Sequence, residues 1–187
     1  MIIFKLFMNV FMFAVFGLMA NDDTPNGLRV HGPCLRVTRY SKDASAGVIG
    51  IGSVVKLATD GYIEPIGDGE SVLPCGVALK YSAASTADDN IPVADHPHQR
   101  FVVQDDGVTT STIAFKGANG DVVNGTVNTT TGKAVSELNS TVGTTGELRI
   151  EKLAKTIYPS GVVNAWGANA DLIVTIAEHQ FNTDDGI

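Results

Sequence analysis

Short apolar runs separated by turn residues are the dominant pattern along this chain of 187 residues. Residues 35–40 (LRVTRY) alternate apolar and polar side chains, which predicts a half-buried strand. Residues 171–177 (DLIVTIA) are almost continuously apolar, which predicts a central strand covered on both faces. Residues 147–156 (ELRIEKLAKT) fit either a strand or a short helix, and no segment has the periodicity of a long amphipathic helix.

Turn residues predict how these runs are connected. The Asp60-Gly61 pair lies between two β-prone runs, residues 48–58 and 62–65, and this arrangement is a strong signal for a β-hairpin. Residues 127–145 are rich in Thr, Ser, Asn and Gly, so we expect a loop or hairpin that protrudes from the core.

The pattern as a whole predicts a mainly β chain, with a β-barrel or β-sandwich core, an extended N-terminal arm and few short helices. Residues 21–47 form the arm and the first strand in this division, and residues 48–181 form the β-rich core with its protruding Thr-rich loop near 127–145. Residues 182–187 are polar and are expected to be a flexible tail.

Residues 1–20 (MIIFKLFMNVFMFAVFGLMA) differ from the rest, because they are almost entirely apolar and carry one charge, on Lys5. They read as a signal peptide, a membrane anchor or a misassigned start that precedes the true start at Met19. The run is short for a membrane span and has no stop-transfer flank. We favour the start at Met19, with a cleaved signal peptide as the second reading.

Composition adds an acidic surface and a core with few aromatic side chains. Hydrophobic residues make up 44% and aromatic residues 7%, so Val, Ile, Leu and Ala must supply most of the core. The 13 Lys and Arg residues against 20 Asp and Glu residues give a net charge of −7. An acidic chain repels phosphate, so we expect no nucleic-acid partner.

Candidate chemistry is sparse. His96 and His98 could face one side of a strand, but only Asp95 lies close enough to complete a zinc site, and a solvated turn explains the pair better. Cys34 and Cys75 are far apart and form no Cys-x-x-Cys motif; isolated cysteines are more often small buried apolar residues than a disulfide.

No serine lies in a Gly-x-Ser-x-Gly elbow, no glycine-rich loop has the length and following helix of a phosphate site, and titratable residues are not concentrated. We therefore predict that the protein is not an enzyme and has no catalytic residues, no cofactor and no metal.

The chain from Met19 onward resembles a family of tailed-phage structural proteins, the capsid decoration or cement proteins. The opening Asn26-Gly27-Leu28 resembles the family's "Gly-Leu/Phe-Arg-Pro-Val", although His31-Gly32-Pro33 departs from that pattern. Further segments follow in the right order: 52–57 (GSVVKL), 76–107 (from GVA to QDDG) and 132–180 (from GK to IAEHQ).

The resemblance implies a protein on the outer surface of an icosahedral capsid, which stabilises the shell by bridging major capsid protein subunits. It also implies a homo-oligomer, a trimer or a dimer, localised to the virion and without a membrane in the mature particle. Multivalent attachment would let each contact be modest, and the arm could add a strand to a sheet edge of the shell. The predicted contact residues are Pro25, Asn26, Gly27, Leu28, Arg29 and Val30.

Two other function classes stay open at this point. A secreted or periplasmic β-sandwich adhesin or binding module requires a working signal peptide and an N-terminus at Asn21. A phage tail or head-fibre component is also β-rich and oligomeric, so the sequence does not separate it from a shell protein. A hydrolase or lyase is disfavoured because no catalytic constellation is visible.

Overall fold

The computed structural model describes residues 20–67 and 73–181 and confirms a mainly β fold. Residues 1–19 and 182–187, predicted as leader or misassigned start and as tail, lie outside the described residues. Within the described part, no helix is long and apolar enough to cross a membrane. The elements are β1 (Arg29–His31), β2 (Val37–Lys42), β3 (Val54–Leu57), β4 (Ile63–Pro65), β5 (Gly76–Ala78), β6 (Asp88–Ala94), β7 (Arg100–Gln104), the 3₁₀ helix η1 (Ile113–Phe115), β8 (Asn119–Gly120), β9 (Val122–Asn128), β10 (Lys133–Leu138), β11 (Leu148–Leu153) and β12 (Asp171–Ile176).

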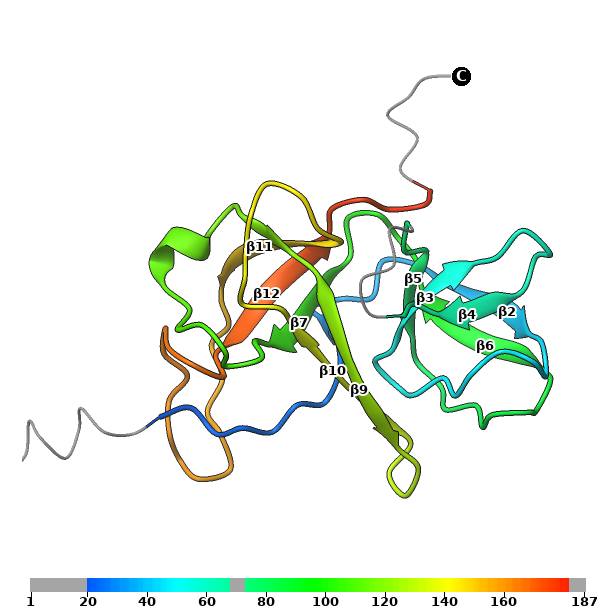
Figure 1. Cartoon of the computed structure of the whole chain (residues 1–187), viewed down its shortest axis with the longest axis horizontal. Coiled ribbons are helices and arrows are strands. Elements are labelled where there is room, and N and C mark those ends of the chain that lie inside the picture. Colours follow the sequence, from blue (N-terminus) through cyan, green and yellow to red (C-terminus); the bar gives the residue numbers. More distant parts are fainter. Residues whose placement is uncertain (1–19, 68–72, 182–187) are drawn as a thin grey trace, which may run out of the picture.

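The strands form two five-stranded sheets and one hairpin. Sheet A has the order β1-β7-β12-β11-β8, and sheet B has the order β2-β6-β5-β3-β4. All pairs between named strands are antiparallel. In Figure 1, sheet A lies on the left and sheet B on the right, and the β9–β10 hairpin runs down between them. The predicted central strand at 171–177 is confirmed, because β12 lies between β7 and β11.

Strands β3 and β5 of sheet B bury side chains on both faces of the sheet, and successive side chains of a strand point to opposite faces. Val54 of β3 and Val77 of β5 pack into the main core with sheet A, whereas their neighbours Val55 and Ala78 pack into a second cluster on the other face. The main core also contains Leu28, Ile66, Ala94, Phe101, Val103, Val122, Leu138, Leu148, Ile150, Ala170, Leu172, Val174 and Ile176. One continuous core therefore joins the two sheets, the hairpin and the arm.

The predicted hairpin at Asp60-Gly61 is confirmed, because β3 pairs with β4 through Leu57 and Ile63 on either side of that turn. In the Thr-rich segment 127–145, which was predicted to be a loop or a hairpin, the structure forms a hairpin, because β9 and β10 pair on either side of the turn before Lys133. Residues 133–138 form β10, in which alternate side chains are buried, so the parts left outside strands are the turn before it and the loop after it. A 2.7 Å hydrogen bond from Ile51 N to Gly132 O joins the hairpin to the segment that precedes β3 of sheet B.

Candidate partner-binding surface

Hydrogen bonds of Asn21 fix the first described residues of the N-terminal arm. The side-chain amide of Asn21, which is 7% exposed, donates 2.9 Å hydrogen bonds to the carbonyl oxygens of Ala165 and Ala168. Its carbonyl oxygen accepts from Ala165 N at 3.1 Å. An amide that satisfies both its donor and acceptor groups on backbone holds one segment in one position, so the start of the arm is fixed against the loop before β12.

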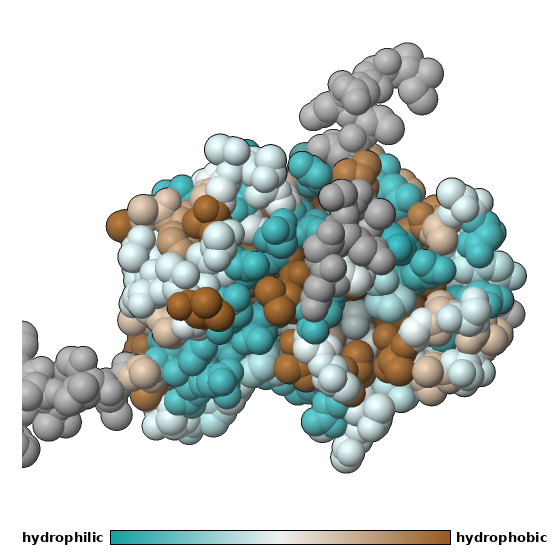
Figure 2. Space-filling view, viewed as in Figure 1, coloured by the Kyte–Doolittle hydropathy of each residue, from teal (hydrophilic) through white to brown (hydrophobic). Residues whose placement is uncertain are grey.

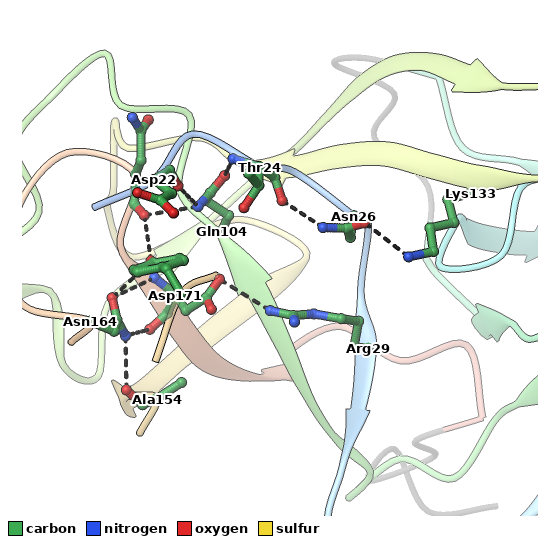
Figure 3. A network of polar contacts seen from close by, with 11 residues as sticks. Asp22, Thr24, Asn26, Arg29, Gln104, Lys133, Ala154, Asn164 and Asp171 are labelled. Carbon is green, nitrogen blue, oxygen red and sulfur yellow. Dashed lines mark hydrogen bonds and ion pairs between the residues drawn. The ribbon is translucent and has the colours of Figure 1, made fainter. Parts of the chain in front are cut away.

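Gln104 at the end of β7 holds the next stretch of the arm, as Figure 3 shows. Its side-chain nitrogen donates to Asp22 O at 2.7 Å and to Asn169 O at 3.0 Å, and its oxygen accepts from Thr24 N at 2.9 Å. Gln104 is 3% exposed, so these bonds form where water does not compete. The arm is therefore part of the folded domain from its first described residues.

The middle of the arm packs into the core. Leu28 is 2% exposed, belongs to the main core cluster, and donates its N–H to Gly52 O at 2.9 Å. Gly27 has φ +64, and a Cβ there would lie 2.8 Å from Gly52 O and 2.9 Å from the Ala134 side chain. Glycine is required at this position, because both the left-handed conformation and the close approach exclude a side chain.

β1 ends the arm by joining sheet A. Arg29 is paired with Val102 in the antiparallel register of β1 and β7. Its guanidinium lies 3.1 Å from the buried carboxylate of Asp171. Asn164 fixes Asp171 in turn, because its side chain both donates to Asp171 O and accepts from Asp171 N. Figure 3 shows this chain of contacts from the arm to β12.

The six residues predicted to contact a partner are thus placed differently from one another. Gly27 and Leu28 are buried, Pro25, Asn26 and Val30 are half-buried, and Arg29 is exposed. Part of this arm is therefore used inside its own chain. What it leaves for a partner is the outer edge of β1, because β1 ends sheet A and pairs with β7 alone among the described strands.

A wide groove of about 860 Å³ lies beside this edge, on the face of sheet A away from the core. A row of paired residues crosses all five strands there, through the pairs His31–Arg100, Arg100–Thr175, Thr175–Arg149 and Arg149–Asn119. All five residues line the groove. The groove is therefore a polar face presented by rigid strands, with the arm at one side.

Sequence reasoning missed this face. The alternation in β7 and β11 does indicate that Arg100 and Arg149 point away from the core, because Phe101, Leu148 and Ile150 are core residues. It does not indicate that residues 49 positions apart in sequence become next-but-one neighbours across β12, since only the strand order brings them together.

Asp95, considered above as a zinc ligand, serves another purpose. It is 1% exposed, its carboxylate accepts from Arg36 Nε and from Tyr40 OH at 2.8 Å each, and its carbonyl accepts from Arg36 Nη2 at 2.6 Å. Burial would raise the pKa of Asp95, but hydrogen bonds from Arg36, Thr38 and Tyr40 outweigh burial and hold it below its usual range. Asp95 is thus a structural anion that fixes the start of β2 to the end of β6.

His96 and His98 lie next to each other, with ring centroids 5.7 Å apart, and His96 Nδ1 accepts from His98 N at 3.1 Å. That bond uses one of the nitrogens a metal would need. Over residues 20–67 and 73–181, no group of three or more His, Cys, Asp or Glu side chains is placed to hold a metal ion. Cys34 is exposed and Cys75 is buried, and both are free thiols.

Carboxylates gather where the arm meets β7 and β10. Burial, together with the nearby charges of Asp23, Asp106 and Asp105, raises the pKa of Glu137 to about 7. Burial also raises the pKa of Asp105, one oxygen of which has no hydrogen-bond partner. This junction therefore carries groups that resist ionisation.

His179 gives a pH dependence that can be measured. Its Nδ1 accepts from Phe181 N at 3.0 Å, and its Nε2 is buried without a partner. Burial lowers the pKa of His179 to about 4; Asp95 opposes this shift, and Arg36 and the other histidines add to it. Between about pH 6.5 and 4, His179 therefore binds a proton in the unfolded chain but stays neutral in the folded chain. The free energy of unfolding falls as the pH falls through this range, by roughly 3 kcal/mol at most.

Chemical denaturation across that pH range checks this. The variant His179→Phe should remove the His179 part of the pH slope. The control His31→Phe replaces an exposed histidine that is not among the charges shifting the pKa of His179, so it should keep that part of the slope. Equal slopes in His179→Phe and the parent chain would contradict the assignment.

Comparison of the chain with protein-family models, with curated proteins and with solved structures finds no match. The resemblance to capsid decoration proteins therefore stays a prediction from the four sequence segments, and the surface described above is the structural basis on which a function can be proposed.

Proposed function

We propose that the protein is a structural component of a tailed-phage virion, which binds the outer surface of the capsid and stabilises the shell by bridging major capsid protein subunits. The segments of resemblance lie on the elements that build the domain: 26–28 in the arm, 52–57 around β3, and 76–107 from β5 through β7. The proposal thus concerns the whole fold and not one local motif.

The observation that carries the proposal is the combination of an anchored arm and an open strand edge. The contacts of Asn21, Gln104 and Leu28 fix the position of the arm. They therefore also fix β1 as the edge strand of sheet A, beside the groove. A strand edge with free backbone groups can pair with a strand of a partner. Because the edge is already ordered, little conformational entropy is lost on binding.

Quantitative mass spectrometry of purified particles from the source phage tests the proposal. The expected result is a copy number close to that of the major capsid protein, with an N-terminal peptide that begins at Met19 or Ala20. A few copies per particle would favour the tail or head-fibre reading. Absence from particles, together with a processed Asn21 terminus in a secreted fraction, would overturn the proposal in favour of the adhesin.

A further inference from the structure

The outer face of sheet A concentrates positive charge in a chain whose net charge is −7. Arg29, Arg100, Arg149 and Lys152, with His31, are all exposed on this face, which we call the cationic face. The register explains the arrangement. His31, Arg100 and Arg149 belong to the row that crosses the sheet; Arg29 and Lys152 belong to the next row, which runs through Val102 and Ile173.

Two of these cations are paired within the chain and two are not. Arg29 lies 3.1 Å from Asp171, and Arg100 lies 2.8 Å from Glu151. The side chains of Arg149 and Lys152 form no ion pair or hydrogen bond with any residue that the structure describes. They lie on the same strand, β11, and supply two unneutralised charges at one place in an acidic molecule.

We propose that the cationic face is a docking surface for an extended, acidic segment of a protein partner, which lies across the strands of sheet A with its carboxylates on Arg149 and Lys152. Charge complementarity selects carboxylates, and the guanidinium of Arg149 can bind one in a bidentate manner. Four steps between strands give the row a length of about 19 Å, which matches roughly six residues of extended chain.

The signs of the charges favour a protein segment over a nucleic acid. Glu151 and Glu178 line the same groove, and Asp171 is paired with Arg29 at its margin. The face therefore alternates positive and negative groups. A uniform phosphate backbone would meet repulsion at each acidic position, whereas a peptide can place uncharged residues there and its carboxylates on Arg149 and Lys152. The net charge of −7 adds long-range repulsion of a polyanion. The proposed function identifies the partner as the major capsid protein; the chemistry of the segment does not depend on that identification.

A peptide-binding experiment tests this chemistry alone. The probe is a fluorescent twelve-residue peptide of alternating Glu and Ser, compared with its Gln and Ser counterpart and with oligothymidylate of equal length. We expect the full chain to bind the Glu peptide, with an affinity that falls as salt rises. The double variant Arg149→Glu, Lys152→Glu should bind it at least about ten-fold more weakly.

The matched control is Arg39→Glu, Lys133→Glu, which makes the same charge change at exposed residues of β2 and β10, outside the cationic face. It should bind as the parent chain does. Equal loss in both double variants, no binding of the Glu peptide by the parent chain, or tighter binding of oligothymidylate than of the peptide would each overturn the inference. Both variants change exposed side chains, and their thermal unfolding should match that of the parent chain.

Co-sedimentation with isolated capsid shells separates this inference from the proposed function. Binding by the parent and the control but not by the cationic-face variant would support both. Equal binding by all three would overturn the inference for the shell and leave the function standing. Absence of binding by all three would count against the proposed function, and the peptide result would then decide the docking chemistry by itself.

Discussion

Replacing Lys42 by alanine should lower the free energy of unfolding by about 3–5 kcal/mol. Lys42 is 0% exposed, and its ammonium group donates 2.9 Å hydrogen bonds to the carbonyl oxygens of Ala83 and Thr86. Burial lowers its pKa, while the carboxylates of Asp88 and Asp43 oppose that shift. The substitution leaves two carbonyl groups without their donor and opens a cavity, so both costs add.

Lys80→Ala is the matched control, because Lys80 also approaches Asp88, at 2.7 Å, but its side chain is 44% exposed. An exposed ion pair contributes little, so we expect a loss below about 1 kcal/mol. Urea denaturation of the two variants at neutral pH measures the difference. A loss for Lys42→Ala as small as that for Lys80→Ala would show that the Lys42 ammonium reaches water.

Leu28→Ala should lower the free energy of unfolding by about 2–5 kcal/mol, because it removes a buried side chain from the main core. The same substitution should make the arm sensitive to protease. Leu28 is the large buried apolar side chain of the arm between the residues that bond to Gln104 and the strand β1 that pairs with β7. Denaturation and limited proteolysis with mass spectrometry measure both effects.

Thr24→Ala gives the comparison for the arm, because the Thr24 side chain is exposed and the contact with Gln104 uses its backbone N–H. We expect a change within about 0.5 kcal/mol. Leu28 was predicted from the resemblance to touch a partner. An unchanged stability for Leu28→Ala, together with lost particle binding, would place this residue in the partner interface instead of the core.

Local features of the fold were predictable from the sequence. The Asp60-Gly61 hairpin was predictable because its signal lies in adjacent residues. β12 was predictable because its six residues form one short, mostly apolar run. β10 was harder to see, because Ala134 and Ser136 are small or polar and yet buried, so composition concealed the alternation.

The burial of Lys42 could not be predicted, because a lysine in an alternating strand normally marks the solvent face. The register of β2 against β6 shifts between Tyr40 and Lys42. Such a bulge changes the face to which the following side chain points, and here it accompanies a lysine that reaches backbone carbonyls on the inside. The cationic face was hidden for a different reason, since its residues come from β1, β7 and β11 and meet only through the strand order.

The strand order of sheet A also determines when the protein can fold during its synthesis. Sheet B is built from a continuous stretch that ends with β6 at Ala94, so all its strands are available while the ribosome is still translating the second half of the chain. Sheet A has β12, its last-made strand, between β7 and β11. Non-local strand pairing is slow, and β7 has no partner on its β12 side until residues 171–176 have been synthesised. We therefore expect the nascent chain to be most prone to aggregation during this interval.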